Sequence, residues 1–237
     1  MLLLTALLAL AAPPTVHQGF PPPYGATRVD GGGFGTYLGG LRLAPRDQPV
    51  RTHDGRVVHH HARVVELPLV RGDLQQCADT AIRLRAEWLR DAGQPVMFHA
   101  TSGDPIPWDR VQGGETPYAV GNGLAWKAGG GDWDSYLRKV FMWAGSESLQ
   151  AHDTVPATTP QPGDLLVQGG FPGHVVVLLD VATRGDDTWV LLGEGFMPAQ
   201  DFHVELGPHG GWWRWSSAMD LPSWSFPEGS LRRFRAP

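Results

Sequence analysis

Two residues could carry out covalent chemistry together: Cys77, the only cysteine in the chain, and His174. A thiolate is the nucleophilic form of cysteine, and it needs a base, usually a histidine held by a third polar group. A single cysteine cannot form an internal disulfide. In an exported protein it is therefore either a small buried hydrophobe or a reactive thiol. We expect Cys77 to be the nucleophile and His174 the base, and an inert buried cysteine is the alternative.

The segment DLQQCADTAIRLRAEWLRDAG, which begins at Asp73, predicts the helix that carries Cys77. Asp73 can serve as the N-cap, and Gln76 three residues later completes a capping-box pattern. The residues expected on its buried face recur at helical spacing: Leu74, Cys77, Ala81, Leu84 and Trp88. Cys77 then lies in the first turn, where unpaired N–H groups and the helix dipole favour a thiolate.

The apolar run after His174 predicts a strand over His174–Val181, and a second strand is expected over Thr188–Gly193. We expect an antiparallel hairpin with its turn at Arg184–Asp187. The end of one strand then lies beside the start of its neighbour. Glu194, which follows the second strand, is accordingly the candidate that accepts the second imidazole N–H. Gln200 is the alternative for this role.

The order of elements, helix first and an antiparallel meander afterwards, indicates an α+β fold. A hairpin is expected around Asp54-Gly55, and a second helix from Asp132 or Asp134 to Gln150. Further strands are predicted over Met97–Thr101, Asp164–Gln168 and Phe202–Leu206. Residues 102–131 read as loop, and residues 211–237 as a Trp-rich irregular tail.

Six residues are expected to contact substrate: Gln76, Gln200, Trp108, Asn122, Trp126 and Lys127. Gln76 and Gln200 lie near the expected nucleophile and its partners in sequence. The other four come from the Gly-, Pro- and Trp-rich segment 102–131, which could form a cleft for a sugar or a peptide. Packing in the core is the alternative role for each tryptophan.

The chain has 237 residues and a net charge of −5. Its length suits one large domain, and the absence of a basic patch excludes nucleic acid as the expected partner. The apolar run over Leu2–Ala12 predicts a signal peptide at 1–12. We expect a Pro/Gly-rich linker at 13–33 and a single domain at 34–237. The protein is then exported, to the periplasm or outside the cell, without a transmembrane anchor.

A histidine run, His59, His60 and His61, raises the question of a metal site. Neither a helical His pair around a Glu nor a Cys/His spacing pattern occurs in the sequence. We therefore expect neither a bound metal nor a cofactor, and the metal-dependent enzyme is the weaker alternative.

The Gly163-Asp164 and Gly173-His174-Val175 segments, with a cysteine that begins a helix upstream, resemble the NlpC/P60 and CHAP cysteine hydrolases. Gln76-Cys77 is followed by Ala78-Asp79, which departs from the signatures of those enzymes. The resemblance implies a papain-like α+β fold and an extracytoplasmic peptidase or amidase. Its substrate would be a cell-wall peptide or a related amide. The alternative is a cell-wall or glycan-binding module on the same fold.

Four longer strings resemble the bacterial domain-of-unknown-function family 4846: DLQQCADTAIRLRAEWL, FMWAGSESL, VQGGFPGHVVVLLD and FMPAQDFHV. This resemblance extends from about Phe34 to Phe226. It implies a bacterial, exported protein and carries no reaction with it, so the chemistry has to be argued from the residues.

Overall fold

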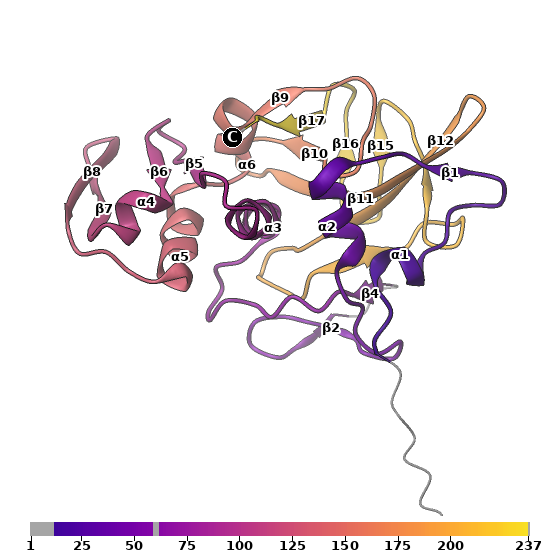
Figure 1. Ribbon diagram of the computed structural model, residues 1–237, viewed down its shortest axis with the longest axis horizontal. Coiled ribbons are helices and arrows are strands. Elements are labelled where there is room, and N and C mark those ends of the chain that lie inside the picture. Colours follow the sequence, from indigo (N-terminus) through magenta and orange to yellow (C-terminus); the bar gives the residue numbers. More distant parts are fainter. Residues whose placement is uncertain (1–11, 59–61, 237) are drawn as a thin grey trace, which may run out of the picture.

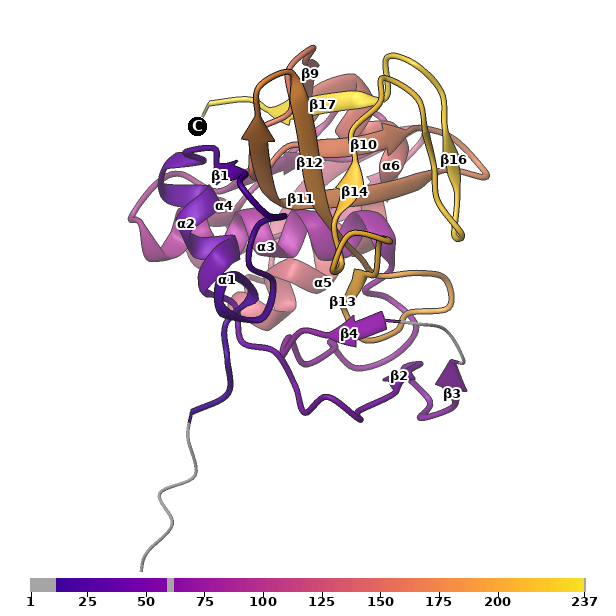
Figure 2. The same ribbon diagram turned by 90° about the vertical axis from the view of Figure 1, so that its right-hand side faces the viewer.

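The computed structural model describes residues 12–58 and 62–236. The protein is a mixed α+β molecule built around a large antiparallel sheet with strand order β4-β13-β12-β11-β10-β17-β9 (Figures 1 and 2). β1 (Thr27–Arg28) pairs with β11, and β14 (Trp213–Arg214) pairs with β12. The strands along the main path are β4 (Ala62–Val64), β13 (His203–Glu205), β12 (Asp187–Glu194), β11 (His174–Arg184), β10 (Leu165–Gln168), β17 (Leu231–Phe234) and β9 (Thr154–Pro156).

The hairpin of β11 and β12 forms the centre of the sheet. Arg184 pairs with Asp187 at its turn, where Gly185 takes a φ of +57°, so the expected hairpin is confirmed. Most residues of both strands are buried. The apolar run after His174 is continuous because both faces of the sheet are covered.

Alternate residues of β10 and β11 face two different cores. Val175 and Val177 pack in the cluster with the helices, whereas Val176 and Leu178 pack against the hairpin of β15 (Met219–Asp220) and β16 (Ser225–Phe226). Figure 2 shows this hairpin and α3 on opposite sides of the sheet. The period-2 alternation of a strand explains how one segment serves both layers.

The helix α3 (Cys77–Asp91) packs against the sheet, and α2 (Gly32–Gly40) lies beside it. The prediction that Asp73 caps this helix was wrong, because the helix begins at Cys77 and Gln76 is its N-cap. Asp79 accepts the N–H of Gln76 at 3.0 Å. Asp73 instead joins two loops, since its Oδ1 accepts the Ala199 N–H at 2.7 Å.

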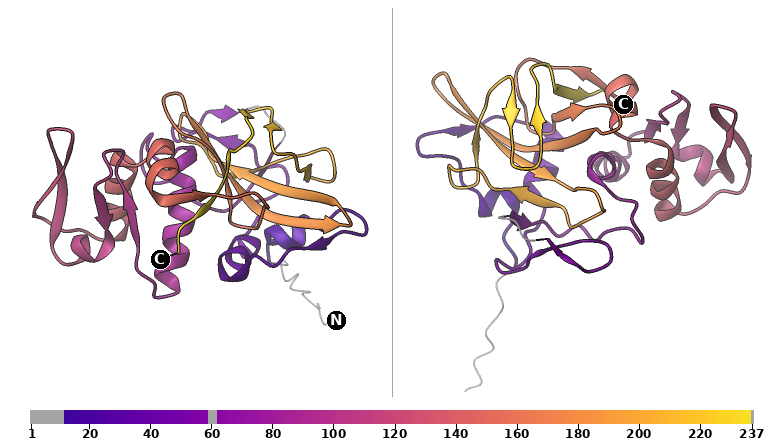
Figure 3. Two further views of the ribbon diagram at one scale, coloured as in Figure 1. Left: turned by 90° about the horizontal axis from the view of Figure 1, so that it is seen from above. Right: turned by 180° about the vertical axis from the view of Figure 1, so that it is seen from behind.

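A unit formed by residues 97–143 extends beyond α3, on the side away from the sheet (Figures 1 and 3). The expectation that residues 102–131 form loops was wrong. The elements of the unit are β5 (Met97–His99), β6 (Pro105–Pro107), α4 (Trp108–Gln112), β7 (Glu115–Val120), β8 (Gly123–Ala128) and α5 (Trp133–Trp143). β7 and β8 form a hairpin. The high glycine and proline content of residues 102–131 suggested loops and did not predict this hairpin.

The second helix is shorter than expected. α5 begins at Trp133, within the predicted range for its start, and Asp132 caps it by accepting the Ser135 N–H, but α5 ends at Trp143. Ala144 has an extended backbone with ψ of 167°, and this residue stops the helix before Gly145. The short α6 (Ser146–Ser148) and a π-helical turn over Leu149–Asp153 complete the segment.

Both ends of the described chain are ordered parts of the fold. Residues 13–33 are not a linker, because they include α1 (Val16–Gly19) and β1, and Val16 and Phe20 lie in the core. The tail is not irregular either, since it supplies β14 to β17, and β17 inserts between β10 and β9. The predicted signal peptide, apart from Ala12, and the histidines 59–61 lie outside the described residues. Within the ranges described, no helix has the length and apolar character to cross a membrane.

Candidate active site

Cys77 is the first residue of α3, and its side chain is partly exposed. The first intrahelical hydrogen bond runs from the Thr80 N–H to the Gln76 carbonyl at 3.0 Å. The N–H groups of Cys77 and Ala78 therefore precede the helical ladder, at the positive end of the helix dipole. Partial exposure and this position fit a reactive thiol better than a buried inert one.

His174 begins β11, and its Nε2 lies 2.8 Å from Oε2 of Glu194, the last residue of β12. Both side chains are 2% exposed. The β11–β12 register brings the two strand ends together, as the hairpin argument predicted. His174 pairs with Glu194 rather than with Gln200, which forms an isolated bridge with Thr52.

The protonation of this pair follows from its contacts. Burial alone would lower the pKa of His174, but hydrogen bonds and negative charge at Cys77 and Glu194 outweigh burial and raise it to about 9. Burial alone would raise the pKa of Glu194, but interactions with His174 and His203 outweigh it and lower it to about 2. The pair therefore rests as imidazolium and carboxylate. Because Nε2 contacts Glu194, Nδ1 is the nitrogen that remains for the Cys77 sulfur.

Aromatic rings hold the His174 ring in place. Its centroid lies 5.0 Å from that of Phe196, 5.4 Å from Trp224 and 5.9 Å from Phe226. Ser223 also donates to Glu194 Oε2 at 3.0 Å. Sequence reasoning missed these residues, since the 223–226 segment has no regular spacing that would link it to His174.

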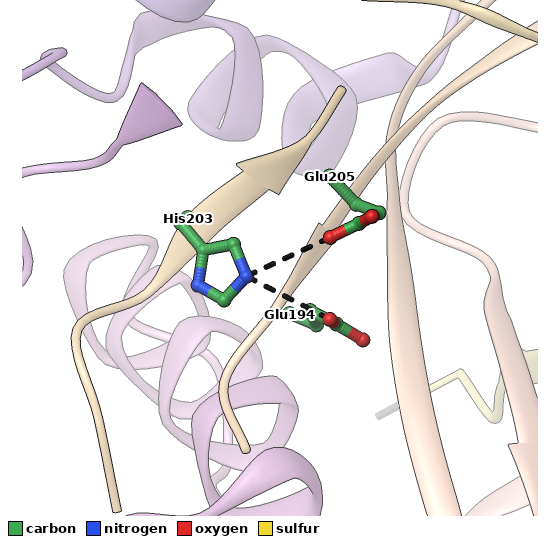
Figure 4. A group of neighbouring side chains, drawn as sticks. All are labelled: Glu194, His203 and Glu205. Atoms are coloured by element: carbon green, nitrogen blue, oxygen red, sulfur yellow. Dashed lines mark ion pairs between the residues drawn. The ribbon is translucent and has the colours of Figure 1, made fainter. Parts of the chain in front are cut away.

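Glu194 also faces a second buried group on the neighbouring strand. His203 Nε2 lies 3.6 Å from Glu194 Oε1 and 3.8 Å from Glu205 Oε2, and Figure 4 shows its ring facing both carboxylates. His203 Nδ1 is 2.9 Å from the Asp201 carbonyl, which directs Nε2 toward the acids. These three side chains could hold a metal ion.

The loop after β12 passes close to the start of α3. A Cβ added to Gly195 would lie 2.7 Å from Thr80 Oγ1 and 3.2 Å from the Gln76 carbonyl oxygen. Only glycine lets the backbone approach this closely without displacement. The glycine thus sets how near Glu194, its neighbour in sequence, lies to the helix that carries Cys77.

The side-chain amides before Cys77 are largely committed to structure. Gln76 donates from Nε2 to Asp73 Oδ1 at 3.2 Å. Gln75 is fully buried, and its Oε1 accepts from Arg83 at 2.7 Å. The Gln75 Nε2 is buried without a hydrogen-bond partner among the described residues. Of the two amides, Gln75 is therefore the one with an unused donor among the described residues.

The structure does not bring Trp108, Asn122, Trp126 or Lys127 to Cys77 and His174. Trp108 packs against the rings of Trp133 and Tyr136, while Trp126 lies under the Arg110 guanidinium at 4.2 Å. Asn122 and Lys127 are exposed on the β7–β8 hairpin, at the end of the molecule away from the sheet (Figure 3).

Two exposed apolar side chains flank the site instead. Phe171 is 93% exposed in the loop before His174, and Met197 is 60% exposed in the loop after Glu194. Sequence reasoning passed over both, because a single apolar residue in a loop gives no periodic signal.

Comparison with known proteins gives one relationship. The family model described as "Domain of unknown function (4846)" matches residues 16–233. No curated protein and no solved structure matches the chain. The match begins at Val16, within the segment that was expected to be a linker, and includes all three residues Cys77, His174 and Glu194.

Proposed function

The chain belongs to the family described as domain of unknown function 4846, and we propose that it is a cysteine hydrolase, a peptidase or amidase. The observation that carries the proposal is the position of His174, which contacts Glu194 through Nε2 and interacts with Cys77. A nucleophile, a base and an orienting carboxylate in this order are the parts that acyl transfer by a thiol requires.

The reaction follows from these contacts. The Cys77 thiolate attacks the amide carbonyl, and the imidazolium of His174 gives its proton to the departing amine. This leaves a thioester on Cys77 and a neutral imidazole, which then takes a proton from the water that attacks the thioester. Glu194 holds the ring and stabilises its charged form. The N–H of Cys77, and that of Ala78, can stabilise the oxyanion because they precede the helical ladder.

We also propose that the fold is papain-like. The arguments are a nucleophile at the first residue of a helix, a base at the start of a sheet strand and an orienting residue at the end of the adjacent strand. Export and a cell-wall peptide or related amide as substrate belong to the same proposal. They rest on the apolar run over Leu2–Ala12 and on the motif resemblance to NlpC/P60 and CHAP enzymes.

The test compares wild type with Cys77→Ala and His174→Gln on peptidoglycan-derived peptides, with release of new amines as the readout. Both variants should lose turnover, and Cys77→Ala should retain the fold because it removes a single sulfur atom. A second measurement follows alkylation of Cys77 by iodoacetamide at pH 6 through the mass of the intact protein. Alkylation should be fast in wild type and slow in His174→Gln. Alkylation that requires unfolding would contradict the proposal.

A non-catalytic cell-wall or glycan-binding module is the second candidate. The feature that favours it is the β7–β8 hairpin, which carries Trp126, Asn122 and Lys127 away from Cys77. Binding of soluble glycan fragments would then be lost in Trp126→Ala and unaffected in Cys77→Ala. A wild-type protein that is inert toward the peptide panel and still binds glycan would support this candidate.

A further inference from the structure

A pocket of about 630 Å³ lies on the far part of α3 from Cys77. Its walls come from α3, β5, the start of α4, the π-helical turn over Leu149–Asp153, and the end of β17 with the residues that follow it. Neither Cys77, His174 nor Glu194 lines it. The volume falls in the range of roughly 300–1,000 Å³ that small-molecule sites occupy.

Arg85 supplies a buried positive charge to this pocket. The residue is 9% exposed, and its guanidinium carbon lies 4.5 Å from the Trp88 ring centroid, 5.1 Å from Phe34 and 5.4 Å from Phe234. The rings cover the guanidinium, so an incoming group has to approach its N–H edge. Burial lowers the pKa of Arg85 to about 10, which leaves it charged at neutral pH.

The hydrogen-bonding capacity of Arg85 is largely unused. A guanidinium carries five N–H donors. Among the described residues, Arg85 makes one hydrogen bond, which it donates to the Arg235 carbonyl at 3.3 Å. Over residues 12–58 and 62–236, no carboxylate lies within ion-pair distance of it. A cation this deeply buried is ordinarily paired.

A fixed imidazole lines the same pocket. His99 Nδ1 lies 2.7 Å from Asp153 Oδ1, and the His99 N–H donates to Asp153 Oδ2 at 3.3 Å. Both oxygens of Asp153 are therefore bonded to His99. The other acidic residue in the lining, Asp109, is exposed to solvent, and its side chain accepts a hydrogen bond from the Arg110 N–H. Within the part of the chain that the structure describes, His99 Nε2 has no hydrogen-bond partner and is left to bind a ligand. Arg235, a second cation of the lining, donates from Nε to the His152 carbonyl.

The remaining walls are apolar and include Leu89, Val96, Phe98, Trp108 and Phe234. We propose that this pocket binds a small organic acid, with its carboxylate on the edge of Arg85 and its apolar body against these walls. The planar fork of a guanidinium matches two carboxylate oxygens, and an apolar, water-poor surrounding strengthens the pair. This site is separate from the proposed active site and does not depend on it.

The experiment titrates the full chain with phenylacetate and with its neutral counterpart phenylacetamide, followed by calorimetry and by the NMR signal of the Arg85 Nε–H group. Branched and straight-chain carboxylates of similar size complete the panel. We expect phenylacetate to bind with a Kd on the order of 1 mM or tighter and to shift the Arg85 signal. Phenylacetamide should bind at least about ten-fold more weakly, since it lacks the charge.

Arg85→Lys keeps the charge and loses the fork, so it should weaken phenylacetate about ten-fold. Arg90→Lys is the matched control, because Arg90 lies on the same helix over the Trp133 ring and does not line the pocket. Equal binding of phenylacetate and phenylacetamide to wild type would overturn the proposal whether or not Arg85→Lys folds. So would the absence of saturable binding by any carboxylate of the panel.

Discussion

The side chains of His174 and Glu194 meet at 2.8 Å although twenty residues separate them, because they are the first and last residues of two strands in one hairpin. The same residues are almost fully buried, so their charges depend on each other. This relationship links the proposed chemistry to the stability of the central sheet.

Glu194→Gln should slow alkylation of Cys77 by iodoacetamide at pH 6 about ten-fold or more and leave a partly active enzyme. Glutamine keeps an oxygen that His174 can contact but loses the charge that stabilises imidazolium. The rate is measured by mass spectrometry of the intact protein. Glu228→Gln, an exposed carboxylate near the end of the chain, is the control. An unchanged rate in Glu194→Gln would remove Glu194 from the proposed site.

The free energy of unfolding should depend on pH through the same pair. The pKa of Glu194 falls from 4.5 to about 2, so its contribution is present above pH 4.5 and is lost as the pH falls toward 2. The pKa of His174 rises from 6.5 to about 9, so its contribution is present below pH 6.5 and is lost as the pH rises through 9. Urea unfolding of wild type and Glu194→Gln should therefore differ most between about pH 5 and 6.5, by about 1–3 kcal/mol. A difference that stays constant to pH 10 would contradict this linkage.

Asp79 should have the opposite pH dependence. Burial raises the pKa of its carboxyl from 3.8 to about 7, although the Gln76 N–H opposes the change. The folded state then binds this proton more tightly, and stability is lost as the pH rises from about 4 to 7. Asp79→Asn keeps an oxygen for the Gln76 N–H and should raise the free energy of unfolding at pH 8 by about 2 kcal/mol. At pH 3.5 urea titrations should give nearly the same free energy of unfolding for the variant and for wild type. A lower free energy of unfolding in Asp79→Asn at both pH values would contradict this prediction.

Gly195→Ala should separate the end of β12 from the start of α3. The new methyl group would lie 2.7 Å from Thr80 Oγ1, so one of the two segments has to move. We expect slower alkylation of Cys77 and a loss of roughly 1–3 kcal/mol in the free energy of unfolding. Thr80→Ala in the same chain removes the nearest contact and should restore part of the rate. Gly40→Ala is the control, because its added Cβ would meet no atom within 4 Å.

The sequence was informative where a single local rule decides the structure. The continuous apolar run and the Gly185 turn defined β11 and β12. Helical spacing placed Ala81 and Leu84 correctly on the buried face of α3, whereas Cys77 and Trp88 are only partly buried and Leu74 precedes the helix. The meeting of His174 and Glu194 followed from hairpin geometry alone. Cys77 was placed correctly in the first turn, although the cap was assigned to Asp73. The N-cap is Gln76, and the carboxylate of Asp79, inside the first turn, accepts its N–H.

The parts that escaped prediction depend on contacts between distant segments. Val16 and Phe20 are core residues in a stretch whose Pro and Gly content suggested a linker. Trp224 packs on the His174 ring and donates a hydrogen bond to Gln168, and no local sequence pattern predicts either contact. The ligand pocket around Arg85 draws on residues from four separate parts of the chain. Local propensity carries no information about such assemblies.

The position of β17 inside the sheet has a consequence for how the molecule is made. Leu231–Phe234 is synthesised after both β9 and β10, yet it lies between these strands and hydrogen-bonds to both. Until it arrives, two strands present unpaired edges, which are templates for association with other chains. Arg233 then closes the sheet by binding Asp164 at 2.7 Å, a contact across 69 residues. The sheet in this half of the protein can therefore close only after Leu231–Phe234 has been synthesised.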